Sequence, residues 1–409
     1  MRYEEYEAAM ATGQKARDCL REQMKAHPEL FPAAMVQGYK FNGWTEVSKK
    51  MPNRQLRRIR LSKTDETGRK LAYTIAPCDV LPYMTGMAAD VEKGLFLKQF
   101  GVPDWALTYL FGRNDSYWYR QTEAFGRYNL VGSTVKEAEK VPKDLLADEK
   151  HAKAHGGKWY VATTVAQNCV LGASVSTTAD AEGLTAAYDV FKQEAQAVDP
   201  HYQPETVNTD GWAATGKAWR LLFPSIVNIL CFLHTFIKIR SRCKRLGDHY
   251  EQIKQQVWEI YRATNRDEFK ERVGALKNWV LDYREGLTTY AIESIDKLCQ
   301  RADQFCLTFD HPTAYRTSNM LDRHMEPMAR WLASSRYFHG NVQSAELRTR
   351  AWALLHNYRI YCPRAKVSNK FRSPAHKLNG FVYRDDWLEN LLVASSCQGF
   401  RLGHKKRLN

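Results

Sequence analysis

The stretch from residue 141 to residue 234 constrains the fold more than any other part of the chain. Short apolar or alternating runs predict strands, and apolar residues at helical spacing predict the helices between them. The predicted strands are residues 141–149, 158–165, 168–175, 205–209 and 225–231. The predicted helices are residues 179–197, residues 212–222 and a segment that begins at residue 232. The order β-β-β-α-β-α-β-α indicates an α/β domain with a mixed sheet.

Two carboxylates occupy matching places in this order. Asp148 closes the apolar run of the first predicted strand, and Asp210 follows the fourth. The order is that of a ribonuclease-H-like fold, in which the first and fourth strands lie side by side. We therefore expect Asp148 and Asp210 to meet at one rim of the sheet, where open α/β sheets bind their ligands. Glu149 would point to the opposite face of its strand and is not expected to join them.

A third carboxylate completes the predicted catalytic and metal-binding set. Asp322 opens a helix that is predicted to pack beside the first strand, and Glu326, one helical turn later, is the alternative third acid. Carboxylates predict Mg²⁺ as the cofactor, with Mn²⁺ as a substitute, because these hard cations prefer oxygen ligands. Two such ions about 3.5–4 Å apart can clamp the attacking and leaving oxygens of an in-line displacement at phosphorus.

The strand patterns stop after His234, and residues 141–236 form the first part of the predicted core. Residues 237–310 keep helical spacing throughout and predict an all-helical insertion. A basic cluster at its start, including Lys238 and Arg240, is predicted to contact DNA. Residues 311–360 then supply the last part of the core with the third acid, and residues 361–409 are predicted to be a basic C-terminal tail.

Residues 1–87 predict an N-terminal helix followed by a basic β-hairpin. Residues 1–35 have the pattern of one polar amphipathic helix, broken near Pro28 and Pro32. Apolar and basic residues then alternate in the first strand of the hairpin, which gives that strand a cationic outer face. The residues on this face that are predicted to contact DNA are Arg57, Arg58 and Arg60. The alternative is a solvated edge whose charges prevent aggregation.

Residues 88–130 predict three short helices that match a helix-turn-helix DNA-binding unit, so we expect a mostly helical N-terminal DNA-binding domain. The third helix is the predicted recognition helix. Its residues predicted to contact DNA are Asn114, Tyr117, Tyr119, Arg120 and Gln121. The alternative is that the three helices only pack together as a structural unit. Residues 131–140 are predicted to be a short linker to the sheet.

The charge of the chain indicates the kind of partner. Lys and Arg number 60 against 45 Asp and Glu, a net charge of +15, which points to nucleic acid or another anionic surface.

The cysteines and the apolar stretches indicate where the protein is found. Nine cysteines without a CxxC pair indicate reduced, intracellular thiols. The first residues lack the apolar core of a secretory signal, and the longest apolar stretch, residues 223–237, contains polar residues. We expect a cytoplasmic, nucleoid-associated protein without a membrane partner.

Three motifs resemble those of DDE/D transposases from bacterial insertion sequences, most closely the mutator-like branch. Thr209-Asp210-Gly211 closes the fourth predicted strand, and Cys231-Phe-Leu-His234 follows the fifth, where that branch and its hAT-like relatives have a Cys or Asp, two residues and a His. Thr317-Ser-Asn-Met-Leu-Asp322-Arg323 is similar to the Thr-Asn-x-Ile-Glu-Arg of the family, with Asp in place of the usual Glu. The resemblance covers about residues 141–360 and includes the helical insertion.

The resemblance implies an enzyme that acts on DNA in two steps. Water hydrolyses a phosphodiester at each transposon end, and the freed 3′-hydroxyl then attacks target DNA. Acting on two ends implies at least a homodimer in the DNA complex. Cys231 and His234 would orient groups at the site, although a buried thiol and a capping histidine explain them equally well. Arg316 and Arg323, beside the third acid, would clamp phosphates or form surface salt bridges.

Two other functions remain open from the sequence. One is a catalytically silent DNA-binding protein derived from a transposase, and the other is a nuclease or integrase of the same fold that cuts without joining. His151 and His155 also suggest a metal pair, although residues of a loop near the DNA backbone are the simpler interpretation.

Overall fold

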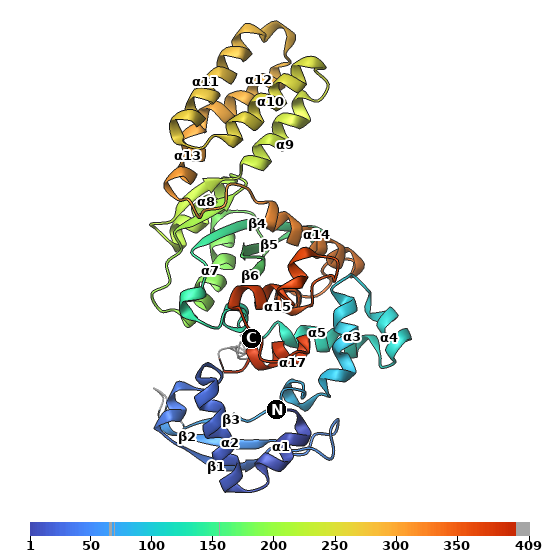
Figure 1. Cartoon of the computed structure of the whole chain (residues 1–409). Helices are drawn as coiled ribbons and strands as arrows, with labels where there is room; N and C mark the ends of the chain where they lie inside the picture. Colours follow the sequence, from blue (N-terminus) through green and yellow to red (C-terminus); the bar gives the residue numbers. More distant parts are fainter. Residues whose placement is uncertain (65–67, 69, 155, 398–409) are drawn as a thin grey trace.

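The computed structural model describes residues 1–64, 68, 70–154 and 156–397. Figure 1 shows an elongated molecule in which an N-terminal part, a central α/β part and a bundle of helices follow one another along the long axis. Among the described residues, no helix is both long enough and apolar enough to cross a membrane.

A five-stranded mixed sheet forms the centre of the chain. Its strands are β4 (Asp144–Ala154), β5 (Gly157–Ala166), β6 (Cys169–Ser176), β7 (Thr206–Thr209) and β8 (Val227–Leu230). The strand order is β6-β5-β4-β7-β8. The first three strands pair antiparallel, whereas β4, β7 and β8 run parallel. The five predicted strands, and the pairing of the first with the fourth, are confirmed.

Helices cover both faces of this sheet. Helices α7 (Ala181–Val198) and α8 (Ala213–Leu222) lie on one face, and α14 (Asn319–Ser334) and α15 (Val342–Tyr358) lie on the other. Leu145 and Ala147 belong to the apolar core on the α7 and α8 side, whereas Leu146 belongs to the core on the α15 side. Successive side chains of a strand point to opposite faces, so β4 is apolar on both.

Strand β4 is longer than the sequence pattern predicts. It continues to Ala154 because its pairing with β5 extends to Ala154 and Gly157, and Ala152 and Ala154 stay buried. The prediction that Asp148 ends the strand is therefore wrong. The parallel pairing of β4 with β7 nevertheless stops at Leu146, so Asp148 lies just beyond the parallel part of the sheet.

The predicted all-helical stretch is a bundle with its own apolar core. Its helices are α9 (Phe232–Cys243), α10 (Asp248–Arg262), α11 (Arg266–Asp282), α12 (Thr289–Gln300) and α13 (Ala302–Asp310). Phe232, Val257, Leu276, Ile295 and Phe305 are among the buried residues that hold it together. The chain enters the bundle directly after β8 and returns through α13, which packs against β8, so the bundle is anchored beside the sheet edge.

The N-terminal part differs from the predicted single helix. Helices α1 (Tyr3–Met10) and α2 (Gly13–Ala26) are separate because Thr12 caps the second by accepting a hydrogen bond from the Lys15 amide. The predicted hairpin exists as β2 (Arg57–Thr64) and β3 (Lys70–Thr74), although part of its turn lies outside the described residues. Strand β1 (Tyr39–Trp44), which the sequence analysis missed, pairs with β2.

Residues 88–134 are not separated from the sheet by a linker. Helices α3 (Ala88–Lys98), α4 (Asp104–Phe111) and α5 (Asp115–Phe125) match the three predicted helices, but Leu95, Leu107 and Trp118 share one apolar core with α14 and α15. Residues 130–134 form helix α6 (Leu130–Thr134), which is entirely buried. Its first amides donate to the Glu194 carboxylate on α7. The linker prediction is wrong because α6 is held in the core by contacts with residues far away in the sequence, which the local pattern does not show.

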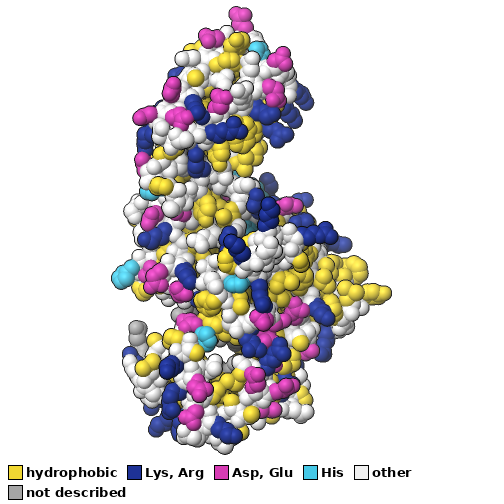
Figure 2. Space-filling view, viewed as in Figure 1, with side chains coloured by type: hydrophobic (Ala, Val, Ile, Leu, Met, Phe, Trp, Pro, Cys, Tyr) yellow, Lys and Arg dark blue, Asp and Glu magenta, His cyan; other side chains and the backbone are white. Residues whose placement is uncertain are grey.

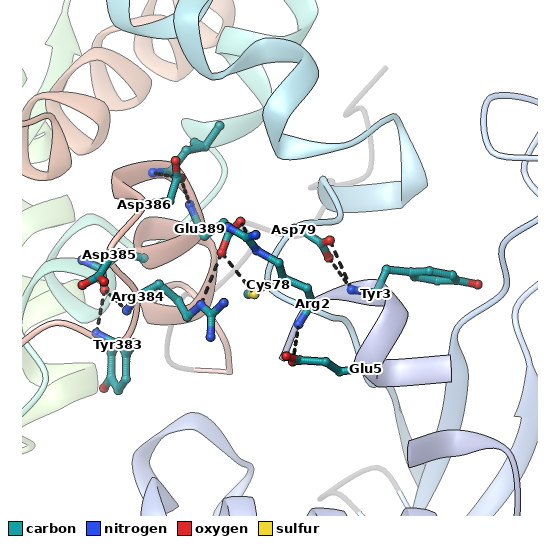
Figure 3. Close-up of polar contacts among 12 residues, drawn as sticks. Arg2, Tyr3, Glu5, Cys78, Asp79, Tyr383, Arg384, Asp385, Asp386 and Glu389 are labelled. Carbon is teal, nitrogen blue, oxygen red and sulfur yellow. Dashed lines mark hydrogen bonds and ion pairs between the residues drawn. The ribbon is translucent and has the colours of Figure 1, made fainter. Parts of the chain in front are cut away.

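Much of the C-terminal segment also belongs to the core rather than to a tail. Helices α16 (Pro374–Asn379) and α17 (Trp387–Ala394) bury Leu378, Leu388 and Leu391. Figure 3 shows the buried Glu389 of α17 between Arg2 and Arg384, whose Nε atoms lie 3.0 and 3.3 Å from its carboxylate oxygens. Arg2 is therefore joined to helix α17, and the basic residues 401–407 lie outside the described part.

Candidate metal centre

Asp148, His234 and Asp322 bring one potential metal-ligand atom each to within 4.8 Å of one another. Asp148 comes from β4, His234 from the first turn of α9 and Asp322 from the first turn of α14. Helix α9 begins at the residue after Cys231, which follows β8 directly. The cluster thus lies where the parallel strands end, the position at which open α/β sheets bind ligands.

Ser318 links the side chains of the cluster. Its hydroxyl lies 3.1 Å from Nδ1 of His234 and donates to Oδ2 of Asp322 at 3.2 Å. Its backbone amide donates to the Cys231 sulfur at 3.2 Å. The sequence analysis included Ser318 in a motif but gave it no role. Only folding brings this serine, from the loop before α14, against the start of α9.

Asp210 lies beside the cluster rather than within it. Its carboxylate accepts a hydrogen bond from the Trp212 amide at 2.8 Å, directly after β7. Burial raises the pKa of Asp148 to about 6, and the charges of Asp210 and Asp322 act in the same direction, whereas the Glu149 amide and His234 oppose them. The negative charge of Asp210 therefore acts on Asp148, which agrees with the predicted proximity of the two residues.

His234 supplies positive charge next to the carboxylates. The hydrogen bond with Cys231 raises the pKa of His234, burial opposes this, and the charges of Asp322 and Asp148 raise it further. Cys231 itself is buried and caps α9, with its sulfur accepting from the His234 amide at 3.5 Å. The buried-thiol interpretation of Cys231 is thus confirmed, whereas the cap of α9 is Cys231 rather than His234, whose ring lies with the acids.

The donor set suits a hard divalent cation. Two carboxylates favour Mg²⁺ or Mn²⁺, and the imidazole of His234, which must release its proton before it can coordinate a cation, is a better ligand for Mn²⁺ than for Mg²⁺. The sequence analysis predicted carboxylates alone as metal ligands, and the position of His234 adds a nitrogen donor beside them. A cation here would also relieve the repulsion between Asp148 and Asp322.

The two neighbouring glutamates lie outside the cluster. The Glu149 carboxylate points to the other face of β4, where it accepts hydrogen bonds from the hydroxyls of Tyr188 and Thr215, both at 2.8 Å. Burial raises its pKa to about 7. Glu326 keeps 74% of its side chain exposed and pairs with Arg330 at 3.7 Å. The geometry therefore favours Asp322 over Glu326 as the third acid.

The basic residues near the site have different environments. Lys238 and Arg240 are exposed on α9, and Arg323 is exposed on α14. Figure 2 shows Lys and Arg side chains gathered on the flank of the bundle formed by α9 and α10. Arg316 instead donates to the Tyr261 carbonyl at 2.8 Å and lies over the rings of Tyr261 and Phe309. Arg316 thus links the loop before α14 to the bundle through Tyr261 and Phe309.

The predicted DNA-contact residues of the hairpin fall into two groups. Arg58 and Arg60 are exposed on β2. The guanidinium of Arg57 instead lies over the rings of Phe41 and Trp44, at 4.5 and 4.9 Å from their centroids, and donates to the Met10 carbonyl. Arg57 is thus part of the packing between β2 and its neighbours.

The predicted recognition helix, α5, packs along α15. Gln121 is buried, and the Tyr119 hydroxyl bonds to Ser344 of α15 at 2.5 Å. Tyr117 is half-buried, and the exposed members of the set are Arg120 and Asn114, whose side chain caps the helix by accepting from the Tyr117 amide. The structural-packing interpretation therefore describes α5 better than a helix free to enter a groove.

His151 lies within β4, where its ring contacts Tyr160 and Trp212, so the interpretation as a loop residue is wrong. His155 lies outside the described residues.

Comparison of the chain with known protein families finds no matching family. A search of curated proteins likewise finds no match.

Proposed function

We propose that this chain is a metal-dependent DNA transposase of the DDE/D type, built on a ribonuclease-H-like core. The observation that carries the proposal is the convergence of Asp148, His234 and Asp322 at the end of the parallel strands, with Asp210 beside them. Strand order β6-β5-β4-β7-β8 supports it, as does a helical bundle inserted between the second and third acids. The resemblance of the motifs around Asp210, His234 and Asp322 supplies the reaction class.

Asp148 and Asp322, together with Asp210 or His234, would hold Mg²⁺ or Mn²⁺ at this edge. When bound, such cations lower the pKa of a ligated water and stabilise negative charge on a phosphodiester. The Ser318 hydroxyl contacts both the Asp322 carboxylate and the His234 ring and thereby orients them relative to each other. Burial around Asp148 limits competing water, which strengthens every electrostatic interaction at the site.

Exposed basic side chains near the cluster would bind the phosphates of the DNA. Lys238 and Arg240 on α9 and Arg323 on α14 flank the cluster on the helices that carry His234 and Asp322. Each phosphate that they neutralise releases counterions, so DNA affinity should fall steeply with salt. The proposed reaction is hydrolysis at the transposon ends, followed by attack of the freed 3′-hydroxyl on target DNA, in a complex with at least two copies of the chain.

The test is cleavage of DNA that carries the sequences flanking this reading frame, with Mg²⁺ or Mn²⁺, beside an Asp210→Asn variant. Metal-dependent cuts at fixed positions, lost in the variant while DNA affinity is kept, are the expected result. Cuts that are never followed by joining to a labelled target would indicate a nuclease of the same fold. DNA binding without cleavage by either protein would indicate a silent DNA-binding descendant.

A further inference from the structure

A cavity of about 610 Å³ lies between the start of α4, the end of α14 and the start of α15. Trp105, Trp331 and Arg348 each line it from a different one of these helices. Its volume lies in the range of pockets that bind small ligands, about 300–1,000 Å³. It shares none of its lining residues with the acid cluster, so it is a separate site.

The cavity offers a flat apolar surface that is open to solvent. The Trp105 side chain lines it and remains 66% exposed. Figure 2 shows hydrophobic side chains gathered over α4, the helix that carries this tryptophan. An exposed indole stacks readily on the planar face of a nucleic-acid base, and such stacking is tolerant of sequence.

The lining of the cavity also carries more basic than acidic side chains. Arg348 lies over the rings of Tyr119 and Trp331, at 5.2 and 5.3 Å from their centroids, and burial lowers its pKa, whereas the charges of Asp104 and Glu123 act in the opposite direction. Arg336 is exposed in the lining. Asp104 is the one acid among the described lining residues, and it is paired with Lys98. The two guanidinium groups of the lining suit a phosphate.

Helix α14 connects this cavity to the acid cluster. Asp322 lies in its first turn, and Trp331 lies nine residues later. At about 1.5 Å per residue, the two are about 14 Å apart along the helix axis. That length equals about four steps of a DNA strand at 3.4 Å each. The axial distance is a lower limit, so a strand bound at the cluster would need at least about four nucleotides to reach the cavity.

We propose that the cavity binds one unpaired nucleotide, with its base against Trp105 and its phosphate between Arg348 and Arg336. This inference rests on the proposed function for its preferred source of the nucleotide, a DNA strand held at the acid cluster. A free nucleotide has the same chemistry and is the other source. Both sources require the aromatic surface and the two arginines.

The test measures binding of a labelled single-stranded oligonucleotide, a duplex of the same sequence and free dTMP to the full chain. The variants are Trp105→Ala and Arg336→Asn, the latter because Arg336 has φ +52°, which Asn tolerates. The control is Tyr109→Ala on the same helix, where the tyrosine is 86% exposed and does not line the cavity. Loss of one stacked base should weaken binding by roughly 5- to 100-fold.

The expected result is weaker binding of the single strand by Trp105→Ala and Arg336→Asn, little change for the duplex and none for Tyr109→Ala. Binding of dTMP alone with the same sensitivity would identify a free nucleotide as the ligand. Equal affinity of all variants for every probe would overturn the cavity assignment while leaving the proposed function intact. Failure of the wild type to bind any probe would overturn both.

Discussion

Ligand atoms of Asp148 and Asp322 lie within 4.8 Å of each other, although one residue belongs to a strand and the other to a helix that follows a complete helical bundle. Two carboxylates this close repel each other, and burial removes the water that would screen them. His234 and Ser318 are the neighbours that offset this repulsion. A divalent cation bound between the two carboxylates would remove the rest of this repulsion.

Replacing Asp322 and Glu326 one at a time should show which of them is the third acid. Asp322→Asn is expected to lower metal-dependent DNA cleavage by roughly 10²–10³-fold, because a bound cation supplies several kcal/mol of charge stabilisation. Glu326→Gln on the same helix is the matched control, since Glu326 faces solvent and pairs only with Arg330 among the described residues. Cleavage rates of the three proteins with Mn²⁺ decide the question. Loss of activity in Glu326→Gln with retention in Asp322→Asn would reverse the assignment.

Replacing His234 should change the preference between metals. The imidazole lies with the two acids, and imidazole favours Mn²⁺ over Mg²⁺. His234→Gln is expected to weaken Mn²⁺ binding by roughly tenfold or more and Mg²⁺ binding by less. Titration calorimetry with each cation, without DNA, gives both constants. An equal loss for the two cations would mean that His234 orients the acids through Ser318 without touching the metal.

A methyl group at position 126 should disturb the packing of α5 on α15. A Cβ on Gly126 would lie 1.8 Å from the backbone oxygen of Leu347, which cannot rotate away. Gly126→Ala is therefore expected to lower the free energy of unfolding by about 1–3 kcal/mol or more. Gly274→Ala in α11 is the control, because nothing lies within 4 Å of its Cβ, and it should raise stability by about 0.5–1 kcal/mol. Urea denaturation compares the two variants, and equal effects would contradict the close packing.

Lys136 should make stability depend on pH in the alkaline range. Its side chain is buried and donates to the Ala394 carbonyl, and burial lowers its pKa to about 7. The unfolded lysine stays protonated until about pH 10.4. Between pH 7 and pH 10 the unfolded state therefore holds the extra proton, and this group makes unfolding harder by about 1.4 kcal/mol per pH unit. Below pH 7 its full destabilising effect is present.

Lys136→Met should remove this slope and raise stability at pH 7. Urea unfolding at pH 7, 8 and 9, followed by tryptophan fluorescence, measures the slope in both proteins. The other titrating groups are the same in the variant, so the difference between the two slopes isolates Lys136. Parallel slopes would show that the buried amine keeps its ordinary pKa.

The contact in Figure 3 should hold the first helix against the C-terminal part of the chain. Glu389 is 6% exposed, and it accepts hydrogen bonds from Arg2 and Arg384. Glu389→Gln is expected to cost only about 1 kcal/mol of global stability, because both arginines are partly exposed and can be hydrated. Hydrogen exchange in residues 3–10 should nevertheless accelerate. Unchanged exchange there would mean that apolar packing alone holds α1.

Local patterns in the sequence determined most of the secondary structure. Apolar periodicity located the five strands of the sheet and the helices of the bundle, because each element buries one stripe or both faces. The order of those elements also placed Asp148 near Asp210, since parallel strands joined by helices end at the same rim. Asp148 was predicted for this reason, and Asp322 was predicted because its helix was expected to pack beside the first strand.

Only the tertiary structure decided which side chains meet. His234 and Ser318 joined the acids because α9 and α14 begin at the same sheet edge, a long-range relation that no local spacing contains. The predicted linker and much of the predicted tail became core because Glu194 and Leu391 bury polar and apolar groups of distant segments. Three residues are of types that often contact DNA, but in the folded chain their side chains contact other parts of the protein or are buried: Arg57, Arg316 and Gln121. Burial is a property of the assembled chain, and residue type alone does not determine it.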